Sequence, residues 1–186
     1  MLGDYYVLQG QLHQPGIYVY PAQGYAELLP AAFESIRRVD NILYGSGGAI
    51  GSDQLPAVPF LNAQPVFAAG IETVAFRNGS GVRFLTQYAQ GNVLVNHVEL
   101  FYQFQGVTRD GAYYVIAILP ITVPILSETG EAAAGGIAPP DLADPNADWA
   151  GYYAAVADLL NGTTPAAFSP SIDELDMLIE SIQVAP

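Results

Sequence analysis

The sequence predicts an α+β fold, with an antiparallel β-sheet of about six strands covered by helices in the order ββαββββαα. Two observations lead to this prediction. Short turns rather than helices join the strand-like segments, which is typical of hairpins and therefore of antiparallel pairing. Two helical patterns then close the chain. The 186 residues, of which 51% are hydrophobic and 12% charged, suit a single domain spanning 1–186.

The first elements follow from apolar runs and their breakers. Residues 5–12 and 17–20 are rich in β-branched and aromatic side chains, and a Pro-Gly turn lies between them, so both are predicted to be strands. From Pro30 to Gly45, apolar residues recur at spacings of three and four, which predicts a helix. Residues 45–65 are rich in Gly and Pro and predict an unusually long connection.

Two hairpins are predicted in the middle of the chain. Residues 71–77 and 82–88 alternate between apolar and polar side chains around Asn-Gly-Ser-Gly. Residues 98–108 and 112–122 do so around Arg-Asp-Gly. Residues 123–146 then shift to Ala, Gly, Pro and acids, a composition typical of a surface segment.

The chain closes with two predicted helices. One begins near Trp149 and ends before Asn161-Gly162, with its large apolar side chains on one face. The other follows Ser171, and the Ser171/Glu174 spacing matches a capping box. Both helices are expected to pack an apolar stripe against the sheet.

The charge balance excludes some partners. Eighteen acidic residues oppose five cations, all of them arginines, for a net charge of −13. Such a chain repels phosphate backbones and anionic headgroups, so nucleic acid and membrane surfaces are not expected partners. No apolar stretch is long enough to span a membrane, and cysteine is absent.

The sequence contains no strong catalytic motif. Two histidines are too few for a three-His zinc site, and neither Gly-x-Ser-x-Gly nor a P-loop occurs. A secreted carboxylate-dependent hydrolase is an alternative, with acids drawn from Glu72, Glu99 and Asp110. It requires two carboxylates about 5 to 9.5 Å apart in a cleft.

An acidic segment before the first C-terminal helix offers a possible calcium site. Its candidate ligands are Asp141, Asp144, Asn146 and Asp148, and the last three have the first spacings of a calcium-binding loop. Trp149 stands where such a loop requires glycine. Carboxylates at a helix start also stabilise the helix directly, which is the alternative explanation.

Three arginines and a tyrosine form a second candidate site. Arg77 and Arg83 flank the first hairpin turn, and Arg109 begins the second. If the turns lie on one edge, these guanidiniums would form a cationic patch that could bind a carboxylate. Tyr102, one of many strand tyrosines, could add an anchor. The alternatives are internal salt bridges for the arginines and a core position for the tyrosine.

Three segments carry a resemblance to a known family: HQPGIYVYP at 13–21, FRNGSGVRFLTQY at 76–88 and FYQFQGVTRDGAYYV at 101–115. They resemble a family of uncharacterised bacterial exported proteins, many of them lipoproteins. The resemblance implies an extracytoplasmic location (periplasmic, cell-surface or secreted), with membrane attachment only through a lipid anchor outside this sequence. The order of elements is similar to the PsbP/Mog1-like fold, an α/β/α sandwich.

These observations give one leading hypothesis and two alternatives. The leading hypothesis is a non-enzymatic, extracytoplasmic binding or assembly module that takes a protein partner or a small ligand and uses no cofactor. The alternatives are the carboxylate-dependent hydrolase and a calcium-stabilised surface protein.

Overall fold

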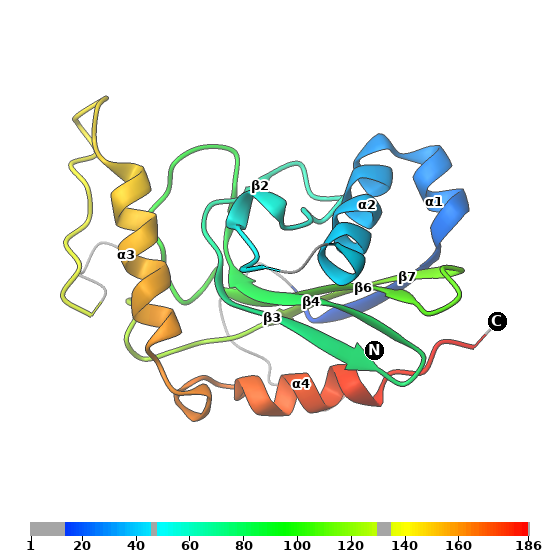
Figure 1. Cartoon of the computed structure of the whole chain (residues 1–186). Coiled ribbons are helices and arrows are strands. Elements are labelled where there is room, and N and C mark those ends of the chain that lie inside the picture. The colour runs from blue at the N-terminus through cyan, green and yellow to red at the C-terminus, as the bar shows by residue number, and fades with distance from the viewer. Residues whose placement is uncertain (1–13, 46–47, 130–134, 186) are drawn as a thin grey trace.

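A five-stranded antiparallel sheet forms the centre of the protein (Figure 1). The structure is a computed structural model that describes residues 14–45, 48–129 and 135–185. In spatial order, the strands are β1 (Gly16–Pro21), β7 (Tyr113–Pro120), β6 (Phe101–Thr108), β4 (Gly79–Thr86) and β3 (Ala69–Phe76). A separate pair joins the two short strands β2 (Gln64–Pro65) and β5 (Tyr88–Ala89).

Helices cover both faces of this sheet (Figure 1). On one face lie α1 (Ala22–Leu28) and α2 (Pro30–Tyr44), so we call it the α2 face. On the other, the α4 face, lies α4 (Ile172–Ser181), while α3 (Trp149–Asn161) stands across one end of the sheet. Two short 3₁₀ helices, η1 (Ser52–Gln54) and η2 (Pro165–Ala167), lie in connections.

The alternation of side chains along each strand divides the core into two layers. In β6, Tyr102 and Phe104 point to the α4 face, where they join the apolar stripes of α3 and α4. Phe101 points the other way and packs with Val39 of α2. The α4 layer is mainly apolar, whereas the α2 layer also buries the polar side chains of Gln103 and others.

A close approach of two strands depends on glycine. Gly81 of β4 and Gly106 of β6 lie directly opposite each other, and the Phe104 ring lies over both. A Cβ added at Gly81 would come within 2.6 Å of this ring, and one at Gly106 within 2.7 Å. Only glycine leaves room for the ring here, so it can fill the core above the strands.

The predicted α+β class, with an antiparallel sheet and helices, is confirmed, as are both hairpins and the helices α2, α3 and α4. The α2 helix begins at Pro30 as expected, and the Ser171/Glu174 capping box is present at the start of α4. The sheet has five described strands rather than about six, and the first predicted strand, residues 5–12, lies outside the described residues. Residues 123–146 hold no named helix or strand in their described part.

Two features differ from the prediction. The short helix α1 follows directly after Pro21, where the sequence indicated only the end of a strand. Seven residues that include Gly24 are too few to show an apolar period, so this helix depends on its packing against the neighbouring elements. The long connection after α2 also contains η1 and β2, although it is otherwise irregular.

Candidate ligand-binding site

The α2–β2 connection, described over residues 48–63, is fixed to the sheet by buried polar side chains. Gln103 and Gln105 of β6 both donate through Nε2 to the Pro56 carbonyl, at 2.9 and 3.1 Å. Ser35 of α2 donates through Oγ to the Ala57 carbonyl at 2.7 Å. Because these side chains are buried, each bond satisfies groups that would otherwise lose their hydrogen bonds to water.

Two tyrosines complete this buried layer. The Tyr88 hydroxyl accepts a hydrogen bond from the Val58 amide at 2.7 Å, and the Tyr114 hydroxyl donates to the Gln105 side chain. Burial raises the pKa of both hydroxyls well above the ordinary tyrosine value. Both therefore stay neutral at physiological pH, and the polar layer holds the connection without a buried charge.

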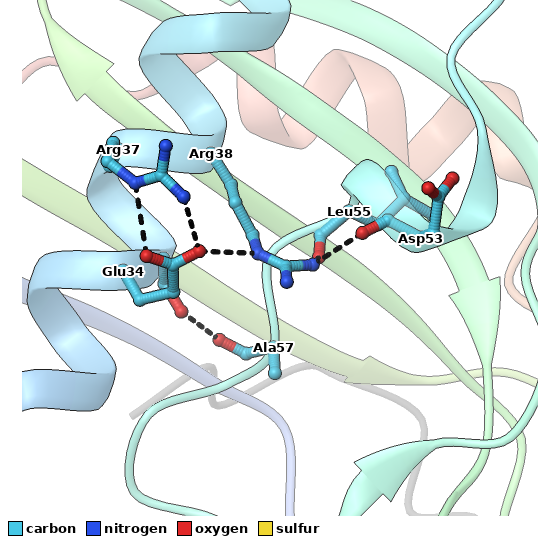
Figure 2. A network of polar contacts seen from close by, with 7 residues as sticks. Glu34, Arg37, Arg38, Asp53, Leu55 and Ala57 are labelled. Atoms are coloured by element: carbon cyan, nitrogen blue, oxygen red, sulfur yellow. Dashed lines mark hydrogen bonds and ion pairs between the residues drawn. The ribbon is translucent and has the colours of Figure 1, made fainter.

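Arg38 ties the outer part of the connection to α2 (Figure 2). Its Nη1 donates to the carbonyls of Asp53 and Leu55, at 2.7 and 2.8 Å. Its Nε donates to the Glu34 carboxylate, one helical turn earlier, at 3.2 Å. The guanidinium therefore links α2 to the backbone of η1 and of Leu55, which follows it, and its fixed fork of donors suits this role.

Glu34 also binds the neighbouring Arg37 (Figure 2). Arg37 donates to the two Glu34 oxygens through Nε at 3.0 Å and Nη2 at 2.7 Å. The Glu34/Arg37 and Glu34/Arg38 spacings of three and four place all three side chains on one surface of α2. Hydrogen bonds from Arg37, and next from Arg38, lower the pKa of Glu34 to about 2. The carboxylate is therefore ionised at neutral pH.

These residues line a pocket, which we call the α2 pocket. Its volume is about 600 Å³, and it lies between α2 and residues 48–54. Its charged lining consists of Glu34, Arg37, Arg38 and Asp53. Its neutral lining includes two amides and two apolar side chains, which are Asn41, Gln54, Ile42 and Ile50. The pocket therefore combines charged groups, hydrogen-bonding groups and a small apolar surface.

The structure places Arg83 and Tyr102 together, but inside the protein. Arg83 of β4 is only 7% exposed and forms ion pairs with Glu72 at 2.6 Å and Asp176 of α4 at 3.2 Å. Its Nη1 donates to the Gly70 carbonyl. The Tyr102 hydroxyl donates to Asp176 at 2.7 Å. These groups bind one another, so Arg83 contributes no exposed positive charge.

Arg77 and Arg109 lie at neighbouring turns. The Arg109 amide donates to the Asn78 carbonyl at 2.8 Å, which brings the two hairpin turns side by side as the sequence suggested. Both arginines are exposed, and neither forms an ion pair within the described residues. The predicted patch thus reduces to two solvated guanidiniums without Arg83.

In the acidic segment at residues 141–148, the aspartate carboxylates accept hydrogen bonds from nearby backbone amides. Asp141 accepts from the Ala143 amide at 2.9 Å, and Asp144 accepts from the Asn146 amide at 2.8 Å. Asp148 caps α3 by accepting from the Gly151 amide at 2.8 Å. Across the described ranges, no group of three or more His, Asp or Glu side chains is placed to hold a metal ion. The calcium site at these residues stays a prediction.

The three acids considered for hydrolysis lie apart. Glu99 precedes β6 and Asp110 follows it, so the length of the strand, about 25 Å for eight residues, separates them. Glu72 pairs with Arg83 near the middle of the length of β3, at the side of the sheet. These three acids therefore do not form a pair with the short separation that glycoside hydrolysis requires.

Glu34, Arg37 and Arg38 were not among the predicted site residues. A signal for them existed, because an acid with arginines three and four positions later is the spacing of a helical ion pair. Two of the five cations of an acidic chain are also adjacent there. The contacts of Arg38 with Asp53 and Leu55 have no signal in the sequence, because they depend on the path of an irregular connection.

Comparisons of this chain with protein-family models, with curated proteins and with solved structures found no match. Among the helices of the described chain, none has the length and apolar character needed to cross a membrane.

Proposed function

We propose that this chain is a non-enzymatic binding module and that the α2 pocket holds a small ligand through a carboxylate group. The observation that supports this most is the placement of two of the five arginines in the lining of this one pocket. A volume of about 600 Å³ lies within the range of sites that bind small molecules. Guanidinium groups are well suited to a carboxylate because their parallel N–H groups match its two oxygens.

The arginines keep donors for such a ligand. Arg37 uses Nε and one side of Nη2 on Glu34, so its Nη1 has no hydrogen-bond partner within the described residues. The Arg37 side chain is 53% exposed, so a ligand can reach it. Glu34 fixes the guanidinium in one orientation, which reduces the entropy that a ligand must overcome on binding.

The electrostatics of the pocket favour binding over hydrolysis. A general acid must carry a proton at the working pH, and its pKa must therefore be raised. Glu34 has the opposite perturbation, since Arg37 and Arg38 lower its pKa to about 2. It serves as an anchor for the arginines rather than as a proton donor.

The wider setting is also part of the proposal. Helices on both faces of an antiparallel sheet support a PsbP/Mog1-like α/β/α sandwich. The resemblance of three sequence segments to exported bacterial proteins supports an extracytoplasmic location. The ligand would then be one that the protein meets outside the cytoplasm.

The test is a titration of the ¹⁵N-labelled protein with N-acetyl-leucine, a carboxylate with an apolar side chain and no positive charge. We expect chemical-shift changes concentrated at residues 34–42 and 48–54. Arg37→Gln should weaken binding by about tenfold, because a charge-assisted hydrogen bond is lost. Arg37 is the better target than Arg38, which also holds the backbone of the connection.

The matched control is Arg77→Gln, which removes an exposed arginine far along the chain from the pocket. It should leave the affinity unchanged. The proposal is overturned if no shift changes occur, if they cluster at Arg77 and Arg109 instead, or if the Arg37 and Arg77 variants bind equally well.

A further inference from the structure

One side of α2 faces solvent and carries large aromatic side chains. In Figure 1, α1 and α2 form the outer layer of this face of the protein. Phe33, Arg37, Asp40 and Tyr44 are all exposed, and the two aromatic residues are 58% and 70% exposed. Residues that are three or four positions apart lie on the same side of a helix. These four side chains therefore form one continuous surface, which we call the α2 stripe.

The arrangement of side chains along the α2 stripe is symmetric. Phe33 and Tyr44 lie at its two ends, equally far from its centre, and Arg37 and Asp40 lie on either side of that centre. The spacing of four, three and four residues is the one at which two helices pack side by side along a seam. In an antiparallel pair around a two-fold axis, Phe33 of each helix would face Tyr44 of the other. Arg37 of each helix would likewise face Asp40 of the other.

From this self-complementarity we infer that the α2 stripe binds a second copy of this chain, in a two-fold symmetric dimer with antiparallel α2 helices. Aromatic residues and arginine are the types that contribute most at protein interfaces. At both ends of the contact, an aromatic ring would pack against another. In the middle, two ion pairs would fix the register of the helices. The inference goes beyond the proposed function and does not depend on it.

Both charged residues of the α2 stripe have capacity for such a partner. Arg37 donates to Glu34 through Nε and Nη2, and its Nη1 has no hydrogen-bond partner within the described residues. Asp40 forms no ion pair in the described part of the chain. Partial burial raises the pKa of the Asp40 carboxyl above its ordinary value, because no cation compensates for the loss of water. The guanidinium of a second copy would supply that cation.

The charge and size of this surface indicate a weak association. A net charge of −13 on each copy opposes self-association, so the contact requires a surface where opposite charges meet. The α2 stripe is also short, since 11 residues separate Phe33 from Tyr44 and a helix rises by about 1.5 Å per residue. Small interfaces of this kind are typical of transient complexes.

The first experiment is sedimentation velocity of the full chain without ligand, because a ligand in the α2 pocket would compete for Arg37. Salt at about 0.15 M screens the net repulsion between copies beyond ~8 Å. We expect a dimer population that grows as the protein concentration rises from about 10 to 500 µM, the range that suits a small interface. A protein that stays monomeric throughout this range would overturn the inference.

Two charge variants test the symmetric pairing. Arg37→Asp gives each α2 stripe two acids, and Asp40→Arg gives each stripe two arginines. In a dimer of either variant, two attractions become two repulsions, so each variant alone should associate at least about tenfold more weakly than the wild type. An equimolar mixture of the two should associate again, since every cation then faces an anion. A mixture that stays monomeric, or single variants that associate like the wild type, would contradict the pairing.

A third variant tests the aromatic ends. Phe33→Ser should weaken the association by about tenfold, because the apolar contact at both ends of the dimer is lost. Met177→Ser is the matched control, since Met177 is a large apolar residue that is 60% exposed on α4, on the other face of the sheet. It should leave the association unchanged. Equal effects of the two substitutions would show that the α2 stripe is not the contact surface.

Discussion

Beneath the sheet, Arg83 is 7% exposed and lies between Glu72 and Asp176. Above it, Arg37 and Arg38 lie on the surface of α2 and share Glu34. In both groups, guanidinium nitrogens lie 2.6 to 3.2 Å from carboxylate oxygens, yet the surroundings of the groups differ. On the α4 face the guanidinium is buried and only the Glu72 carboxylate is largely exposed, whereas the ion pairs of the α2 face open to a pocket.

The difference teaches how one kind of interaction serves two purposes. Removing one partner from a buried network leaves a charge without compensation, so such a network resists change. An exposed pair contributes little to stability, because water and salt screen it. Its donors can therefore be shared with a ligand at small cost to the fold. The four predictions below test this comparison, from the largest expected effect to the smallest.

The largest effect should come from Arg83→Met. The variant leaves Asp176 partly buried without its guanidinium partner, so we expect the free energy of unfolding to fall by about 3 kcal/mol. Urea denaturation followed by circular dichroism measures this. Arg77→Met, at an exposed arginine, should change it by less than about 0.5 kcal/mol. Equal effects of the two substitutions would contradict a structural role for the Arg83 network.

Tyr102→Phe should lower the free energy of unfolding by about 2 kcal/mol, since it removes a buried hydrogen bond to the charged Asp176. The same urea titration measures it, with the exposed Tyr44→Phe as control. The pH dependence gives a second readout. Burial, and next the charge of Asp176, raise the pKa of Tyr102 above its ordinary value of 10.0.

The sign of that dependence follows from linkage. The folded pKa of Tyr102 lies above the unfolded one, so its contribution is present below pH ~10 and is lost as the pH rises further. Tyr102→Phe should therefore lose less stability than the wild type between pH 9 and 11, a range set by the ordinary tyrosine pKa of about 10. A variant with the same alkaline decline as the wild type would show that Tyr102 does not titrate this way.

Ser35→Ala tests the α2 face and should have an intermediate effect. It removes the buried hydrogen bond to the Ala57 carbonyl, so the free energy of unfolding should fall by about 1 kcal/mol. Ser181→Ala is the matched control, because the Ser181 hydroxyl also donates to a carbonyl, at 2.7 Å, but is exposed. A control with the larger effect would mean that the connection is not held by this contact.

The smallest effect is expected from Glu34→Gln at neutral pH, where its exposed ion pairs are screened. A difference should emerge in acid. The folded pKa of Glu34, about 2, lies below the ordinary value of 4.5, so its contribution is present above pH 4.5 and is lost as the pH falls towards 2. Thermal melts should show a shallower acid decline for the variant than for the wild type.

Glu180→Gln, at another exposed glutamate, is the control for the acid titration and should follow the wild type. The comparison between the two faces would fail if Glu34→Gln destabilised the protein at pH 7 as strongly as Arg83→Met does. The Glu34 network would then be part of the fold rather than a surface that supports a pocket.

Local patterns explain how far the fold could be predicted. The Asn-Gly and Asp-Gly turns fixed both hairpins, and the Ser171/Glu174 spacing fixed the start of α4, because each feature needs only neighbouring residues. The α1 helix was missed because seven residues hold too little pattern. The paired glycines Gly81 and Gly106 show their purpose only when Phe104 lies over them.

The candidate site was less accessible from sequence for a physical reason. The Glu34 spacing to Arg37 and Arg38 is local and could have been identified on the predicted helix. The link from Arg38 to Asp53 depends on a long irregular connection. The link from Arg83 to Asp176 joins residues that are 93 positions apart. Tertiary contacts of this kind produce no regular spacing in the sequence. The sequence therefore does not show whether an arginine forms a buried ion pair or is exposed to solvent.

Among the described strands, β1 lies at one side of the sheet, and this position has a consequence for how the protein forms. Gly16 at its start pairs with Ile118 of β7. This strand can therefore pair only after a segment about 100 residues later in the chain has been made. The remaining strands of the sheet lie within that interval and join neighbours much nearer in sequence. During synthesis at about 5–20 residues per second, β1 is therefore without its partner for several seconds. We expect the central hairpins to form first and the N-terminal edge to be the last part of the sheet to become native.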